Sequence, residues 1–251
     1  MGMWYSRGVD SFPSVYQKKQ SLIYRPPIAK REEDYQNLTD HTVHEIIDGI
    51  SIITSLENSN KYLIFCHGNG MDAYQCVPLI QQLRTIYKVN VIAFDYPTYG
   101  LSNGNISEGA CIASLNVVIS SLPKKSKIIL VGHSLGTGVV VGYCHKYKWK
   151  QNILLISPFK NLPQVVYNNS IVSSILTSIS PTENFESLSK IRYLRCKIQI
   201  VHGQADTVIN HSHSIALRNT NRSIKLRLYE KANHVDIIET VFNDVEIITP
   251  L

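Results

Sequence analysis

Apolar runs of strand length alternate with longer helical segments over most of the chain. The predicted strands are Tyr62–Cys66, Asn90–Phe94, Lys127–Val131, Ile153–Ile156, Ile198–Val201 and Ile224–Leu228. The predicted helices lie near 73–87, 108–121, 135–148, 161–178, 211–219 and 235–243. Continuous apolar strands separated by helices are typical of a parallel sheet that is covered on both faces. The pattern therefore predicts an α/β fold.

The first forty residues do not share this pattern. Residues 1–41 lack a sustained period and contain several prolines, so we expect an irregular basic arm there and a single α/β domain over 42–251. The domain opens with Thr42–Ile47 and Ile50–Leu56, which flank the Asp48-Gly49 pair. Asp-Gly between two apolar segments predicts a tight β-hairpin.

Composition and charge narrow the class of protein. The 251 residues are 44% hydrophobic and 18% charged, as in an ordinary globular protein. No run of 18 apolar residues or apolar N-terminal run occurs, so we expect no membrane-spanning helix and no secretory signal. The five cysteines are scattered and odd in number, which argues against a disulfide framework and favours a cytoplasmic location.

The net charge of +6 is concentrated at the start of the chain. Residues 1–31 hold six cations and one acid, a charge of +5, which leaves only +1 for the rest. A nearly neutral domain argues against nucleic-acid binding. An anionic partner such as a membrane surface would therefore meet residues 1–31.

A serine motif marks the candidate nucleophile. Gly132-His133-Ser134-Leu135-Gly136 matches G-x-S-x-G directly after a predicted strand and at the start of a predicted helix. This is the context of a nucleophile elbow, which lifts the serine oxygen above the sheet. Ser102 lies in a second match, but the preceding strand ends near Asp95, five residues before the first glycine of that match, Gly100, and no helix follows. The sequence therefore favours Ser134.

A serine nucleophile needs a histidine base, and that base needs an acid to orient it. The chain order in hydrolases with this motif is serine, acid, histidine. Asp206 follows the predicted strand Ile198–Val201, and His234 follows the last predicted strand. Both lie at the same sheet edge as Ser134, so we predict a triad of Ser134, Asp206 and His234.

Other polar residues near this edge have simpler interpretations. Asp95 can cap the turn after its strand and Asp236 can charge the first turn of the last helix, and both remain alternative acids. His211 and His213 are two residues apart and do not share one helix face. We therefore expect no metal site and no cofactor.

Acyl transfer also needs two preset N–H donors for the oxyanion. One is expected to be the backbone of Leu135, the residue after the nucleophile. The other is assigned to the N–H of Asn69, in the glycine-rich loop 67–70 that follows the strand Tyr62–Cys66.

These residues resemble the α/β-hydrolase fold family, over about residues 42–243. The chain is most similar to the alpha/beta hydrolase domain-containing acyl-protein depalmitoylases. The segments that carry the resemblance are His67-Gly68-Asn69, the run from Asp95 to Gly104, Ser157-Pro158, and Leu188–Ser214. The resemblance implies a mostly parallel central sheet, a serine hydrolase, and the triad positions for Ser134, Asp206 and His234. The chain departs from that group by having His133 where Gln is usual and no cysteine before Cys66.

The segment that would form a lid limits the shape of the site. Only about forty residues separate Ile153–Ile156 from Ile198–Val201, which predicts a minimal lid and an open site. An open site suits a bulky acyl ester or acyl thioester, with a lipidated protein as one such partner. The alternatives are a monoacylglycerol lipase, a general carboxylesterase and a non-catalytic scaffold.

The N-terminus carries a short lipidation pattern. Residues 1–6 fit M-G-x-x-x-S, which predicts myristoylation of Gly2. One myristoyl chain binds membranes only marginally, and the +5 charge of residues 1–31 would add a second signal. Peripheral membrane contact through this arm is therefore an expectation.

Overall fold

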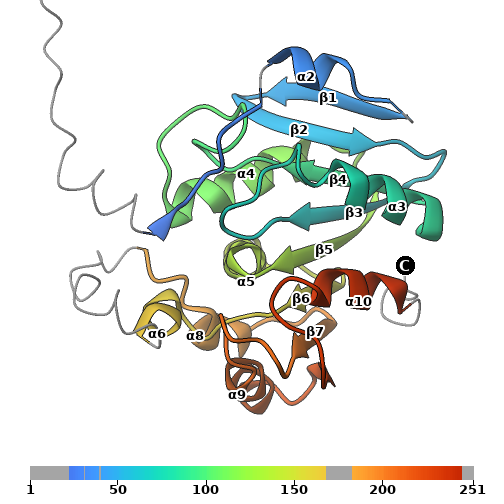
Figure 1. The fold of residues 1–251 in the computed structure, drawn as a ribbon. Coiled ribbons are helices and arrows are strands. Elements are labelled where there is room, and N and C mark those ends of the chain that lie inside the picture. The colour runs from blue at the N-terminus through green and yellow to red at the C-terminus, as the bar shows by residue number, and fades with distance from the viewer. Residues whose placement is uncertain (1–22, 31, 40, 168–182, 245–251) are drawn as a thin grey trace, which may run out of the picture.

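The central sheet has eight strands, which form one continuous layer (Figure 1). The structure is a computed structural model that describes residues 23–30, 32–39, 41–167 and 183–244. The strand order is β1-β2-β4-β3-β5-β6-β7-β8. The strands are β1 (Thr42–Ile47), β2 (Ile50–Ser55), β3 (Lys61–Cys66), β4 (Asn90–Phe94), β5 (Lys127–His133), β6 (Ile153–Ile156), β7 (Ile198–Gly203) and β8 (Lys225–Tyr229). In this order the strands from β4 to β8 are parallel, whereas β1 and β2 pair antiparallel at one side.

The α/β fold expected from the sequence is confirmed. Each predicted strand is present with its ends shifted by no more than two residues, and the hairpin turns at Asp48 and Gly49, both with positive φ. Helix α3 (Val77–Tyr87) begins four residues later than predicted, with a proline in its first turn. Proline is well suited to the first turn, and residues 73–76 form a turn before it.

Helices cover both faces of the sheet and enclose two apolar cores. One core lies under α3 and α10 (Ile237–Asn243), and includes Leu83 and Val241. The other lies under α4 (Glu108–Ser121), α5 (Leu135–Tyr147), α8 (Ser187–Ile191) and α9 (Ser212–Thr220). Because both faces are covered, the middle strands are buried along their whole length, as their unbroken apolar sequences require.

The stretch before the domain is not irregular throughout. Residues Glu32–Gln36 form α2, whose buried Tyr35 packs against the rings of His44 in β1 and Tyr74. Upstream, Ile23 and Tyr24 are only 6% and 3% exposed. The chain of residues 23–30 runs across the carboxyl end of the sheet before it reaches α2 (Figure 1). These residues therefore pack on the domain, although residues 1–22 lie outside the described part.

The lid segment is partly described. Helix α6 (Leu162–Tyr167) covers the start of the predicted helix 161–178, and the remainder of that prediction lies outside the described residues. Helix α8 was not expected from the sequence. No helix in the described ranges is both long and apolar enough to cross a membrane.

Candidate active site

Ser134 stands in a sharp turn between β5 and α5. Its φ is 51° and its ψ is −117°, a conformation that ordinary residues rarely adopt. A Cβ added at Gly132 would lie 2.6 Å from the Gly136 carbonyl oxygen, and one at Gly136 would lie 2.0 Å from the Cys66 carbonyl oxygen. Both glycines are therefore required by close backbone approach, as the G-x-S-x-G pattern indicates.

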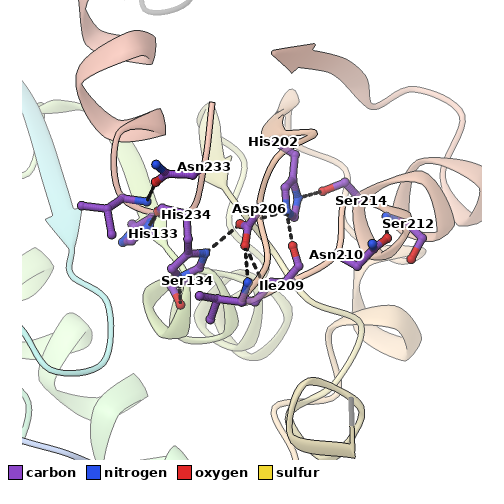
Figure 2. Close-up of polar contacts among 12 residues, drawn as sticks. His133, Ser134, His202, Asp206, Ile209, Asn210, Ser212, Ser214, Asn233 and His234 are labelled. Atoms are coloured by element: carbon purple, nitrogen blue, oxygen red, sulfur yellow. Dashed lines mark hydrogen bonds and ion pairs between the residues drawn. The ribbon is translucent and has the colours of Figure 1, made fainter. Parts of the chain in front are cut away.

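The structure brings Ser134, His234 and Asp206 together at the carboxyl edge of the sheet (Figure 2). His234 Nε2 lies 3.1 Å from Ser134 Oγ. On the other side of the ring, His234 Nδ1 lies 2.7 Å from Asp206 Oδ2. A carboxylate can only accept, so Nδ1 carries the proton and Nε2 is left to accept the serine proton. This arrangement has the geometry of an acid, base and nucleophile in series.

Asp206 is held as a carboxylate by donors on every side. Its Oδ1 accepts the N–H groups of Val208 and Ile209 at 2.9 and 2.8 Å. Burial disfavours the charge, but hydrogen bonds from His202, His234 and the Ile209 N–H outweigh it and hold the pKa of Asp206 well below its usual range. The residue therefore stays ionised beside His234.

His202 was not singled out from the sequence, yet it contacts the acid. Its Nε2 lies 3.3 Å from Asp206 Oδ2 and 2.8 Å from the Ile209 carbonyl oxygen. On the other side, its Nδ1 lies 2.6 Å from Ser214 Oγ. Because a carbonyl only accepts, Nε2 is the donor in the contact with Ile209. A histidine inside an apolar strand, four residues before the acid, was the available signal.

His133 packs against the ring of His234. The His133 and His234 rings lie 5.0 Å apart, and His133 Nε2 is 3.0 Å from the His234 carbonyl oxygen. Burial, together with the neighbouring His234, lowers the pKa of His133 to about 3. His133 is therefore neutral and donates to that carbonyl through Nε2–H.

The loop after β3 passes directly over the nucleophile. A Cβ at Gly68 would lie 3.4 Å from Ser134 Cβ, so the main chain leading to Asn69 borders the serine. Leu135 is the first residue of α5, and the first N–H groups of a helix have no carbonyl partner within it. The two residues expected to stabilise an oxyanion thus flank Ser134, and their role remains a prediction.

The alternative residues lie elsewhere and have structural partners. Ser102 Oγ accepts the Ser51 N–H at 2.8 Å and donates to the Asp95 carbonyl at 2.9 Å, so it fastens the loop after β4. Asp95 itself accepts the Ala73 N–H at 2.7 Å. Asp236 accepts the Asn233 N–H at 2.7 Å. Each side chain therefore has a structural partner: the Asp95 bond reaches the turn before α3, and the Asp236 bond closes the turn before α10.

Comparison with known proteins decides the family. The family model described as "Alpha/beta hydrolase family" matches residues 63–211, which is more than half of the chain. The chain belongs to the alpha/beta hydrolase family. It is 32% identical over 262 residues to alpha/beta hydrolase L404 of Acanthamoeba polyphaga mimivirus, covering 96% of this chain and 95% of that protein. This alpha/beta hydrolase is therefore related to L404 over nearly the full length of both.

The chain is also similar to animal proteins in sequence and to solved structures in fold. The chain is 28% identical over 195 residues to alpha/beta hydrolase domain-containing protein 17C of Xenopus laevis, covering 75% of this chain and 60% of the relative. It thus spans a little over half of the length of such relatives. The Pyrococcus furiosus esterase Pf2001 superimposes with a TM-score of 0.68 at 19% identity, covering 89% of this chain and 95% of that one, which supports the fold.

Proposed function

We propose that this alpha/beta hydrolase cleaves acyl esters or thioesters through an acyl-enzyme on Ser134. The observation that carries the proposal is the continuous contact from Ser134 through His234 to Asp206, with 3.1 and 2.7 Å between the atoms concerned. A serine whose proton can pass to an oriented imidazole is the arrangement required for acyl transfer. A non-catalytic scaffold would have no need of it.

The proposed reaction has two steps. His234 Nε2 takes the Ser134 proton as Oγ attacks the acyl carbon, and the N–H groups of Asn69 and Leu135 are assigned to the oxyanion. The proton then passes to the leaving sulfur or oxygen, which departs as a thiol or alcohol. A water deprotonated by His234 attacks the acyl-enzyme. The bond to Ser134 Oγ then breaks, His234 returns the proton to Oγ, and the carboxylic acid is released. The cycle uses only residues of this chain and water.

Among possible substrates, we favour an acyl thioester on a protein. The loop sequences around Asn69, from Asp95 to Gly104 and near Asp206 resemble those of acyl-protein depalmitoylases. The similarity to alpha/beta hydrolase domain-containing protein 17C supports the same group. A monoacylglycerol lipase or a general carboxylesterase would share the same triad, so substrate assays separate the three.

A fluorophosphonate probe tests the proposed nucleophile. Wild-type protein and the Ser102→Ala variant should be labelled, because Ser102 fastens a loop, whereas Ser134→Ala should not. The Ser134 variant should also lose on the order of 10⁴-fold or more in kcat. Labelling that persists in Ser134→Ala would refute the proposal.

A substrate panel then tests the class. Palmitoyl-cysteine peptides should be cleaved with a higher kcat/KM than monoacylglycerols and short p-nitrophenyl esters. A preference for the glyceride would favour the lipase, and a preference for short esters would favour the carboxylesterase.

A further inference from the structure

The side chain of Asn69 is held on three sides by groups far from it in sequence. Its Oδ1 accepts the Tyr99 hydroxyl at 2.6 Å and the Arg25 N–H at 2.8 Å. Its Nδ2 donates to the Ile23 carbonyl at 2.6 Å. We call Ile23, Arg25 and Tyr99 the Asn69 clamp.

The clamp is itself fastened to the rest of the domain. The Arg25 N–H also reaches the Tyr99 hydroxyl at 3.1 Å, so the three groups form one closed set. Tyr99 is fully buried and packs edge-on against Tyr96. The hydroxyl of Tyr96 in turn donates to the His67 carbonyl at 2.9 Å, two residues before Asn69. The loop beside Ser134 is thus fixed from the side of the β4 loop as well.

The N-terminal part of the clamp is anchored at a second point. The Tyr24 hydroxyl donates to Glu183 Oε2 at 2.6 Å, and the same oxygen accepts the Glu108 N–H at 2.7 Å. Because Tyr24 is buried and lies between the two clamp residues of this segment, its bond fixes where Ile23 and Arg25 stand. Residues 23–25 therefore connect the loop above Ser134 with the first turn of α4.

We infer that the Asn69 clamp positions the loop 67–70 so that the Asn69 N–H faces the reacting acyl oxygen. This inference rests on the proposed function. An oxyanion donor acts only when it is preset, because a loop that must reorganise in the transition state loses the advantage. Ile23 and Arg25 precede the family match at 63–211, so a segment outside the matched region completes the site.

The clamp residues act as positioning residues, since their side chains and main chain contact Asn69 and no reacting atom. Loss of their hydrogen bonds to Asn69 should weaken binding of the transition state and leave ground-state binding of the substrate unchanged. That signature separates positioning from a purely structural role, which would change stability and leave kcat in the folded protein unaltered.

Two substitutions in the full-length protein test the inference. Tyr99→Phe removes the hydroxyl that bonds Asn69, and Asn69→Ala removes the clamped side chain but keeps its N–H. Tyr87→Phe is the matched control, because it likewise removes a hydrogen-bonded tyrosine hydroxyl, in this case the one that donates to the Phe242 carbonyl at 3.1 Å, where α3 meets α10.

The measurements are kcat and KM for a p-nitrophenyl ester, the inhibition constant of an alkyl trifluoromethyl ketone, and the melting temperature. The ketone forms a hemiketal oxyanion on an active serine, so its affinity reports the oxyanion site. We expect Tyr99→Phe to lower kcat and weaken the ketone in parallel, by about three- to tenfold, with KM within about twofold. Asn69→Ala should lower kcat and ketone affinity further, on the order of 10- to 100-fold. Tyr87→Phe should change neither kcat nor ketone affinity.

The outcomes separate the inference from the proposed function. Unchanged kcat and ketone affinity in both clamp variants would overturn the inference, as would equal losses in Tyr87→Phe. A wild-type protein that neither reacts with fluorophosphonate nor binds the ketone would refute the proposed function, and the inference with it.

Discussion

Replacing Asp206 with asparagine tests the proposed base through its proton. The asparagine keeps an oxygen for the N–H groups of Val208 and Ile209, which the aspartate binds at 2.9 and 2.8 Å, so the loop can keep its shape. The other half of the side chain becomes an NH₂ group facing His234 Nδ1, where the carboxylate oxygen stands at 2.7 Å. An NH₂ donor cannot face an N–H donor, so His234 must move its proton to Nε2. The nitrogen that faces Ser134 then has no lone pair to accept the serine proton.

The size of the loss follows from this change of tautomer. A folded enzyme in which the base holds its proton on the wrong nitrogen loses about 10³–10⁴-fold in kcat, equal to roughly 4–5.5 kcal/mol of transition-state stabilisation. The assay is p-nitrophenyl ester hydrolysis at saturating substrate, with the circular dichroism spectrum compared with that of wild type. KM should change little, because Asp206 does not touch the substrate in the proposed reaction.

Asp236→Asn is the matched control for this prediction. Asp236 is two residues from His234 and caps the turn before α10 by accepting the Asn233 N–H at 2.7 Å, a bond that an asparagine oxygen also accepts. Its kcat should stay within about threefold of wild type, as for a surface substitution. Full activity in Asp206→Asn, or a large loss in Asp236→Asn, would refute the assignment of the acid.

Two other side chains, His133 and Asp95, and the N-terminus allow further tests of single features. His133→Gln should keep most of the activity, because an amide N–H can still reach the His234 carbonyl, whereas His133→Ala should lower kcat by about three- to tenfold; an equal loss in both would contradict the role of this bond. Asp95→Asn should remove a pH dependence of stability: burial raises the Asp95 pKa from 3.8 to about 7, so the wild-type free energy of unfolding falls as pH rises from about 4 to 7, by on the order of 3 kcal/mol. Urea unfolding at pH 4.5 and 8 checks this, and an equal change in the free energy of unfolding between the two pH values in wild type and Asp95→Asn would argue against it. Gly2→Ala should shift the protein from the membrane to the soluble fraction of cells if Gly2 is myristoylated, with mass spectrometry of the N-terminus as the direct measurement, and an unmodified wild-type N-terminus would exclude it.

The fold could be predicted from the sequence because its strands are unbroken apolar runs. Asn90–Phe94 and Ile153–Ile156 occur with the predicted bounds, since a strand buried on both faces has no other pattern. The order of the strands in the sheet could not be predicted in this way, because it depends on pairings between distant segments. The placement of β3 between β4 and β5 comes from such pairings, which no local pattern encodes.

The candidate site also has residues that the sequence could predict and residues that it could not. Ser134 could be found from its motif, and Asp206 and His234 from their positions after strands in the chain order of hydrolases. His202 and the Asn69 clamp were missed, because their contacts join residues that have no motif. The clamp includes main-chain groups of Ile23 and Arg25, and a main-chain hydrogen bond depends on where the backbone runs and leaves no trace in residue type.

The two buried carboxylates at this sheet edge differ in charge, and this difference favours only one of them as the acid that orients the proposed base. Asp95 and Asp206 are both shielded from water, and both follow strands of the sheet. At Asp95 burial prevails over the hydrogen bonds and raises the pKa to about 7, so near neutral pH this group is partly protonated. At Asp206 two histidines and main-chain N–H groups outweigh burial and hold the pKa far below its ordinary range. An orienting acid must remain charged while the imidazolium forms beside it, because the attraction between them stabilises the transition state. Charge, as well as distance, therefore favours Asp206 as the proposed orienting acid.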